Sequence, residues 1–202
     1  MDITTIAKLQ NKGVLISPVI ANLFEIYTAD IRPVLDKQKN KHLKLEQRRA
    51  FFKPTLIVKS EKKQLLANNF ELYYLIKSPN LDQDTFKQNV LVSSLTEEEG
   101  SFGIAFFELL ETTSRYKAIL DLSIIYTKLN NILTKDMTQK LLKKNNFSIR
   151  TFCTLIGITE RTYHIRRTKS LKLWHKIKYK PIKKSGYVIQ SYYIFLAIII
   201  RA

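Results

Sequence analysis

The chain has 202 residues, with 34 Lys and Arg against 17 Asp and Glu, which gives a net charge of +17. A composition of 45% hydrophobic and 25% charged residues is ordinary for a folded protein and excludes wholesale disorder, while five Gly and five Pro exclude a collagen-like chain. A single Cys excludes both a disulfide framework and a cysteine-rich zinc site.

Two segments before residue 40 have helical periodicity. A short helix is predicted over 2–11 and is ended by Gly13. A second helical stripe extends from 18 to 37, where Pro18 suits the first turn. Because proline lacks a backbone N–H, Pro33 is expected to kink or end this helix.

The next part of the chain changes from helical to strand periodicity. Residues 37–53 are strongly basic and contain Phe51 and Phe52. After them, β-branched and alternating patterns predict strands at 54–60, 64–67 and 89–94, with one helix at 70–77 between the second and third strands.

Beyond residue 95 the predicted elements are helices, at 106–111, 117–133 and, with breaks, 135–170. The expected fold class is therefore α+β. The expected division is a small mixed domain at 1–95, a helical DNA-binding domain at 96–185, and an apolar tail at 186–202.

The apolar tail permits two interpretations. Residues 187–200 are almost continuously apolar, but a membrane-spanning helix needs about 20 such residues. A core element or a dangling end is the favoured interpretation, and a membrane-surface anchor over 176–200, aided by its lysines, is the alternative. Since residues 1–13 have no apolar core of signal-peptide length, we expect a protein that is not secreted. Its expected location is cytoplasmic or nucleoid-associated, or an organelle stroma if it is organelle-encoded.

The positive charge is concentrated late in the sequence, where residues 140–184 contain fourteen basic residues and one acid. Such a concentration is typical of a surface that binds a polyanion, and nucleic acid is the first expectation. The chain is also rich in residues with AT-rich codons, which indicates an AT-rich genome. Because this bias raises the Lys content, the positions of Arg carry more weight.

One segment within this basic region, SIRTFCTLIGITERTYHIRR at 148–167, has the spacing of a helical hairpin with a tight turn. Cys153 is small enough for a close helix crossing, Gly157 suits the turn, and the Thr159 hydroxyl suits the cap of a second helix. This pattern resembles the helix-turn-helix of DNA-binding proteins. Two residues depart from it, because Tyr163 and Arg166 stand where smaller apolar residues are usual.

The resemblance implies that a second helix, from Glu160 to about Thr168, faces the major groove of DNA. Arg161 could then pair with guanine and Glu160 with cytosine, while flanking cations contact phosphates. An ordinary helical hairpin with a solvated basic face is the alternative interpretation. The full predicted set of DNA-contacting residues is Lys143, Lys144, Arg150, Thr159, Glu160, Arg161, Thr162, His164, Arg166, Arg167 and Lys169.

A longer pattern precedes this motif. A strand begun by proline (PTLIVKS), a short hairpin strand (KQLLA) and a turn into a helix (NNFELYYLIKS) follow one another before the helical region. Their order is similar to that of ParB-type partition proteins over roughly residues 45–170. The family's turn carries a Gly, an acid and two Arg that hold nucleotide phosphates, whereas this chain has Asn68, Asn69, Phe70 and Glu71. The resemblance therefore implies a domain without nucleotide binding that serves as a dimerisation or protein-contact scaffold.

The sequence offers no arrangement typical of catalysis or metal binding. His42, His164 and His175 are far apart, Cys153 lies in an apolar setting, and no glycine-rich phosphate loop with a Lys is present. We therefore expect a protein that is not an enzyme and needs no cofactor or metal. The expected function is sequence-specific binding of double-stranded DNA by a homodimer, as a partition-like or transcription-regulatory factor. The first alternative is a non-catalytic scaffold at a membrane surface or in protein contacts. The second is an enzyme that uses the partition-like fold for nucleotide chemistry, against which the residues from Asn68 to Glu71 argue.

Overall fold

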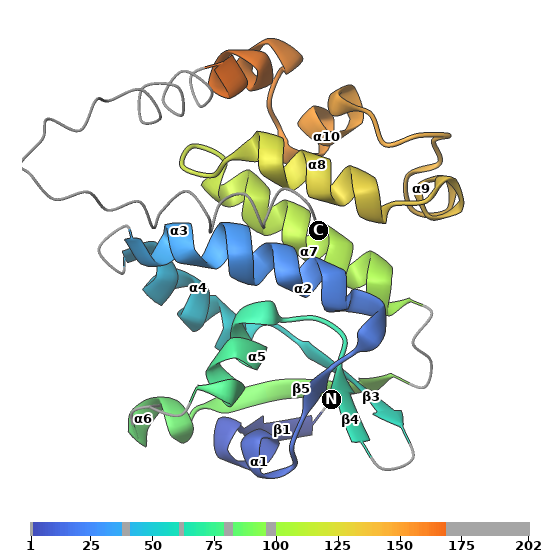
Figure 1. Cartoon of the computed structure of the whole chain (residues 1–202). Coiled ribbons are helices and arrows are strands. Elements are labelled where there is room, and N and C mark those ends of the chain that lie inside the picture. Colours follow the sequence, from blue (N-terminus) through green and yellow to red (C-terminus); the bar gives the residue numbers. More distant parts are fainter. Residues whose placement is uncertain (1, 38–40, 61–62, 79–82, 96–99, 169–202) are drawn as a thin grey trace, which may run out of the picture. The chain divides into compact units, whose positions relative to one another are not determined.

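The computed structural model describes residues 2–37, 41–60, 63–78, 83–95 and 100–168 (Figure 1). Contacts between residues divide the chain into two units, Met1–Arg167 and Thr168–Ala202. Whereas we expected a boundary at residue 95, the first unit extends across it, because helices from both sides of that position share one hydrophobic core. The apolar tail, the lysine-rich stretch before it and Lys169 lie outside the described residues.

Within the described residues, five strands form one mixed sheet in the order β1-β5-β3-β4-β2. β3 and β4 are antiparallel, whereas β3 lies parallel to β5 and β2 parallel to β4. The three predicted strands are present as β3, β4 and β5, and two short ones were not predicted. The strands are β1 (Asp2–Thr5), β2 (Leu15–Ile16), β3 (Thr55–Ser60), β4 (Lys63–Leu66) and β5 (Asn89–Leu95).

The predicted helix at 2–11 is wrong in its first four residues. They form β1, which pairs antiparallel with β5. Only Ile6–Asn11 is helical (α1), and its cap is Thr5, whose hydroxyl accepts from the Lys8 N–H. The partner strand begins more than eighty residues later, so local periodicity could not reveal this pairing.

The helical stripe expected between 18 and 37 is present, but Pro33 does not end it. The run begins with a 3₁₀ turn and includes a π-helical segment just before the proline. A widened turn relieves the missing N–H and the ring clash that proline brings to an α-helix. Its parts are η1 (Pro18–Ile20), α2 (Ala21–Ile26), η2 (Tyr27–Ile31) and α3 (Arg32–Lys37).

The helices beyond residue 100 begin and end differently from the prediction. α7 (Ser101–Tyr116) starts earlier than the helix predicted at 106–111 and is longer. A turn separates it from α8 (Leu122–Ile132), because the Asp121 carboxylate accepts from the Ser123 and Ile124 N–H groups and so fixes a new helix start. The remaining helices are α4 (Lys41–Phe52), α5 (Phe70–Lys77), α6 (Gln83–Phe86), α9 (Lys135–Leu142), α10 (Ile149–Ile156) and an unlabelled helix at 160–168.

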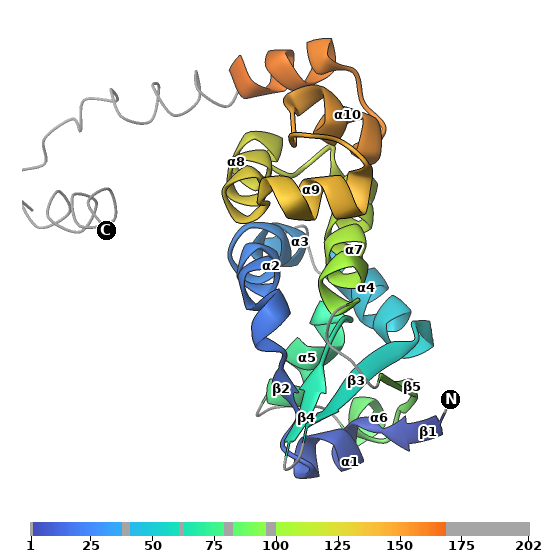
Figure 2. The ribbon, with the colours of Figure 1, turned by 90° about the vertical axis from the view of Figure 1, so that its right-hand side faces the viewer.

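Helix α7 organises the larger of two hydrophobic cores. Its buried residues Phe102, Phe106 and Leu109 belong to a cluster that reaches from α2 to α10. A smaller cluster joins the sheet to α1, α4 and α5. Figures 1 and 2 show the sheet at one end of this unit and α8, α9 and α10 at the other, with α7 between them. The predicted α+β class is therefore confirmed. Of the helices described, none has the length and apolar character needed to span a membrane.

Candidate nucleic-acid interface

Residues 149–168 form two short helices joined by a tight turn, as the sequence motif predicts. α10 ends at Gly157, which has the left-handed φ of 68° that an L side chain rarely adopts. Its N–H donates to the Thr154 carbonyl at 3.2 Å. A Cβ at this position would also lie 3.3 Å from Lys117 Nζ. The turn thus needs glycine for its backbone angle, whereas the Lys117 ammonium, at the end of a flexible side chain, could move away from a Cβ.

Hydroxyl groups start both helices. Ser148 Oγ accepts from the Thr151 N–H at 3.2 Å at the beginning of α10. Thr159 Oγ1 accepts from the Thr162 N–H at 3.2 Å, and the two threonine hydroxyls are 2.9 Å apart. The structure therefore contains the expected Thr159 cap. The hydroxyls of Thr159 and Thr162, both predicted DNA contacts, bind each other at the start of the helix.

The inner face of the motif is packed against the rest of the unit. Phe152, Cys153 and Tyr163 are all buried, which agrees with the predicted core role of Cys153. The Tyr163 ring fits where a smaller residue is usual because it joins an aromatic cluster, 6.1 Å from the Tyr126 ring and 6.3 Å from the Phe152 ring. Burial raises the pKa of the Cys153 thiol, the opposite of what an activated nucleophile requires.

A set of hydrogen bonds ties the motif to the end of α7. Lys117 Nζ donates to the carbonyls of Ile156 and Gly157 at 3.1 and 2.8 Å, and Ser114 Oγ donates to Ile156 at 2.9 Å. In return, the Arg166 guanidinium donates to the Lys117 carbonyl. Arg166, one of the predicted DNA contacts, is therefore half-buried and held by the protein itself. Nothing near it in the sequence indicates this partner, which is 49 residues away.

The outer face of helix 160–168 is open to solvent. Arg161, His164 and Ile165 are exposed at the i, i+3 and i+4 positions that share one side of a helix. Ile165, 47% exposed, was not among the predicted contacts. The predicted residues that the structure shows exposed are Lys143, Lys144, Arg150, Thr159, Glu160, Arg161, His164 and Arg167.

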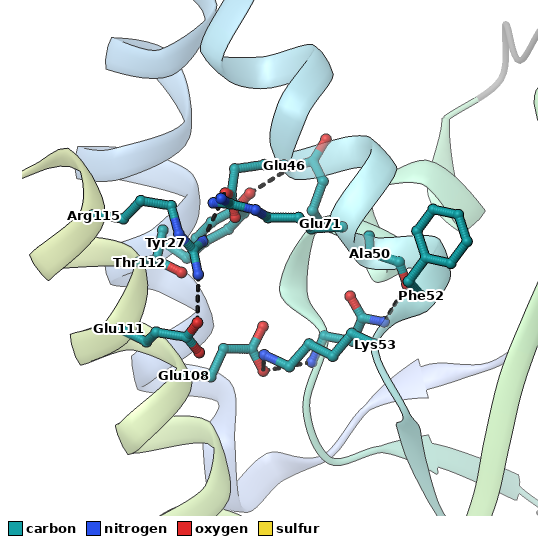
Figure 3. Close-up of a pocket in the computed structure, with 12 residues that line it drawn as sticks. Tyr27, Glu46, Ala50, Phe52, Lys53, Glu71, Glu108, Glu111, Thr112 and Arg115 are labelled. Carbon is teal, nitrogen blue, oxygen red and sulfur yellow. Dashed lines mark hydrogen bonds and ion pairs between the residues drawn. The ribbon is translucent and has the colours of Figure 1, made fainter.

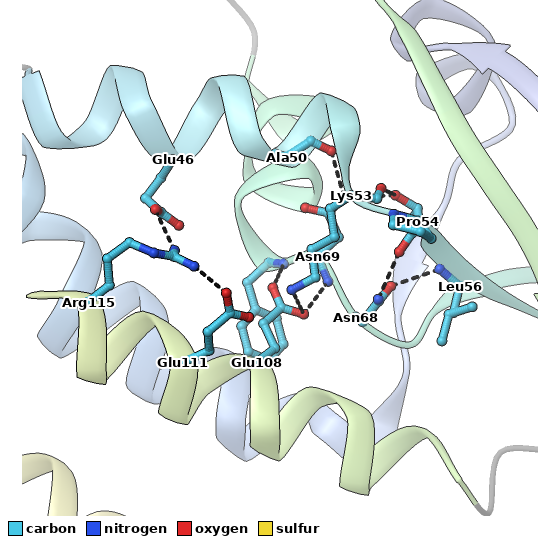
Figure 4. A network of polar contacts seen from close by, with 12 residues as sticks. Glu46, Ala50, Lys53, Pro54, Leu56, Asn68, Asn69, Glu108, Glu111 and Arg115 are labelled. Carbon is cyan, nitrogen blue, oxygen red and sulfur yellow. Dashed lines mark hydrogen bonds and ion pairs between the residues drawn. The ribbon is translucent and has the colours of Figure 1, made fainter. Parts of the chain in front are cut away.

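The turn before α5, where the partition-protein resemblance places a nucleotide site, is instead fixed by two asparagines. Asn68 Oδ1 accepts from the Leu56 N–H at 2.8 Å, and its amide donates to the Pro54 carbonyl at 3.0 Å. Asn69 has a left-handed φ of 63°, and its amide donates to the Ala50 carbonyl at 2.9 Å. Both side chains thus join the turn to neighbouring elements (Figure 4).

A carboxylate from α7 occupies the start of α5. Glu108 accepts from the N–H groups of Asn69 and Phe70 at 2.7 and 3.1 Å and pairs with Lys53 Nζ at 3.1 Å. Such N–H groups at a helix start are donors that commonly bind phosphate. Here the protein supplies its own anion, so an anion from solution would have to displace Glu108. No feature of the sequence near α5 indicates this residue, which lies 39 positions after Asn69.

Glu71, the acid of the same turn, points into the protein. It is 4% exposed and accepts from Tyr27 Oη at 2.6 Å, Arg32 Nε at 3.1 Å and Gln47 Nε2 at 3.3 Å. Burial raises the pKa of its carboxyl group despite these three donors. Its contacts join η2, α3 and α4 to α5, which is a structural role.

A cavity of about 460 Å³ lies between α4, α5 and α7 (Figure 3). Its acidic side chains have basic partners, as where Arg115 contacts both Glu46 and Glu111. Within the described part of the chain, no group of three or more His, Cys, Asp or Glu side chains could hold a metal ion. The outer face of helix 160–168 is therefore the stronger candidate for a functional surface.

Comparison of the chain with protein-family models, with curated proteins and with solved structures finds no match.

Proposed function

We propose that this protein binds double-stranded DNA through the outer face of helix 160–168. The observation that carries the proposal is that one side of this helix is held by the protein and the other side is exposed. Tyr163 and Arg166 hold it to the protein, while Arg161, His164 and Ile165 remain on the side open to solvent. A helix anchored in this way can enter the major groove, which is wide enough to admit an α-helix.

The charge around the helix supports a phosphate-rich partner. Residues 140–168 contain seven basic residues and one acid, Glu160. Lys143 and Arg150 are exposed beside the motif, at the end of α9 and the beginning of α10. Such cations bind phosphates and supply affinity that does not depend on base sequence.

The outer face also offers chemistry that distinguishes bases. The Arg161 guanidinium can donate two hydrogen bonds to guanine, and the Glu160 carboxylate can accept from cytosine. Ile165 adds an apolar group suited to the methyl group of thymine. These residues are our proposed base contacts, and the exposed lysines and Arg167 are the proposed phosphate contacts.

We place this activity in a partition-like or transcription-regulatory factor that acts as a homodimer. The order of a mixed sheet followed by a helix-turn-helix supports the partition-like role. In that role the sheet region is a scaffold without nucleotide, which agrees with the way Glu108 fills the start of α5.

The first test is a salt titration of binding to random duplex DNA, repeated with anionic vesicles. We expect log affinity to fall linearly with log salt, with a slope of about −0.9 for each phosphate contacted. Vesicle binding without DNA binding would instead support the membrane-surface alternative.

The second test is Arg161→Ala, measured on duplexes selected from a random pool. We expect a loss of about 1–3 kcal/mol that varies with the base at one position. Lys143→Ala should weaken binding to all sequences equally, and Lys87→Ala, an exposed cation beyond α6, should change nothing. If Arg161→Ala binds every sequence as the parent does, helix 160–168 is not the base-reading element.

A further inference from the structure

Helix α4 carries the basic segment that the proposed function leaves unused. Its inner residues Leu43, Glu46 and Ala50 are buried against the protein. At 100° per residue, its other side is a single exposed stripe within an arc of about 100°. The stripe consists of Lys41, Lys44, Leu45, Arg48 and Phe52.

The cations of this stripe differ from the other basic residues nearby. Arg49, at the edge of the stripe, pairs with Glu46 at 2.9 Å, and Lys53 pairs with Glu108 at 3.1 Å. Among the residues described, Lys41, Lys44 and Arg48 have no acidic partner within ion-pair distance. Their charge is therefore available to an external anion.

Two large apolar side chains stand among these charges. Phe52 is 81% exposed, the largest exposed fraction among the large hydrophobic residues described, and Leu45 is 42% exposed. Figure 3 shows the Phe52 ring directed away from the charged groups of the cavity. An aromatic face beside a row of cations is the combination with which proteins bind unpaired bases and their phosphates.

From this surface we infer a second nucleic-acid site on α4, and its ligand is single-stranded DNA. The stripe spans about 16 Å along the helix, with cations towards its start and the aromatic ring at its end. Phosphates lie along Lys41, Lys44 and Arg48, and an unpaired base stacks on Phe52. This site uses a different helix from the duplex-binding face, so the inference does not depend on the proposed function.

Three features favour this ligand over the alternatives. A duplex keeps its bases stacked on one another, so it has no free base for Phe52. A helix that lies in a membrane surface separates its apolar face from its charged face, whereas around this helix Leu45 and Phe52 lie between Arg48 on one side and Arg49 on the other. The stripe has no side-chain oxygen that could accept from a ribose 2′-hydroxyl, so it offers that group only the Lys and Arg donors that it already offers to phosphates.

The test is fluorescence anisotropy with a labelled oligodeoxythymidine of about 15 nucleotides, within the range of known single-strand sites. An excess of unlabelled random duplex occupies the duplex-binding surface. Phe52→Ala should weaken binding of the oligonucleotide about 5- to 140-fold. Lys44→Ala combined with Arg48→Ala should make the log–log salt slope shallower by about 1.4, which is 0.7 for each phosphate that is no longer neutralised. Binding of duplex DNA should be unchanged in both variants.

Lys87→Ala is the matched control, because it removes an exposed cation far from α4 in the sequence. All substituted side chains are exposed, so circular dichroism should show the parent fold. Oligonucleotide binding by the α4 variants equal to that of Lys87→Ala would overturn the inference. So would tighter binding of oligouridine than of oligodeoxythymidine. A third contradicting result is loss of binding to anionic vesicles while oligonucleotide binding persists, since that outcome assigns the stripe to a membrane.

Discussion

Replacing Glu108 by Ala tests whether the protein's own carboxylate stabilises the start of α5. The substitution removes an acceptor that binds the N–H groups of Asn69 and Phe70 at 2.7 and 3.1 Å and an ion pair with Lys53. Hydrogen bonds to a charged group contribute about 1.5–3 kcal/mol each. Because the adjacent cavity admits water, which can bind the freed N–H groups, we expect the lower end of the summed range. The free energy of unfolding should fall by about 3 kcal/mol.

For a chain of this length, that loss lowers the melting temperature by about 6–12 °C, at 2–4 °C per kcal/mol. The assay is thermal unfolding followed by circular dichroism. The control is Glu111→Ala, whose side chain is 63% exposed and pairs with Arg115 at i,i+4 spacing. Exposed pairs of this kind contribute about 0.3–0.5 kcal/mol, so this variant should melt within about 2 °C of the parent.

Glu108→Ala should also acquire a response to added anion. With the carboxylate gone, two N–H groups and Lys53 face a position that inorganic phosphate can fill. Phosphate should then raise the melting temperature of the variant more than that of the parent, at ionic strength matched with chloride. A variant that melts as the parent does, or that gains nothing from phosphate, would refute the claim that Glu108 serves as the built-in anion.

Two further predictions separate structural from binding roles. Arg166→Ala should lower the melting temperature, since it removes the bond from the second helix to the Lys117 carbonyl, whereas Arg167→Ala should weaken DNA binding without changing stability. The opposite pattern would reverse the roles assigned to these two arginines. Burial and the bond to Glu46 raise the pKa of Tyr116 from its ordinary value near 10 to about 12. Its contribution to stability is therefore complete below pH 10 and is lost as the pH rises towards 12. Denaturant unfolding of Tyr116→Phe should show a smaller decline over this range than the parent, and equal declines would contradict the assignment.

The sequence by itself determined the local features of the two-helix segment at 149–168. Gly157 at the turn, the Thr159 hydroxyl and the apolar positions of both helices act through neighbours within a few residues, so their spacing predicts their structure. The same holds for the β-branched strand at β3 and the helix at α5, whose predicted bounds agree with the structure.

Only the tertiary structure decided which side chains of these elements are exposed and which are bound within the protein. Arg166 and Arg167 are adjacent in the sequence, yet one donates to a carbonyl 49 residues away and the other is exposed. Glu108 binds the backbone at the start of α5 although it lies 39 residues later in the sequence than Asn69. β1 pairs with a strand that begins near residue 90. The physical reason is that such contacts form when segments distant in the sequence bury a shared core. The local sequence around one partner therefore does not predict which distant residue it will contact.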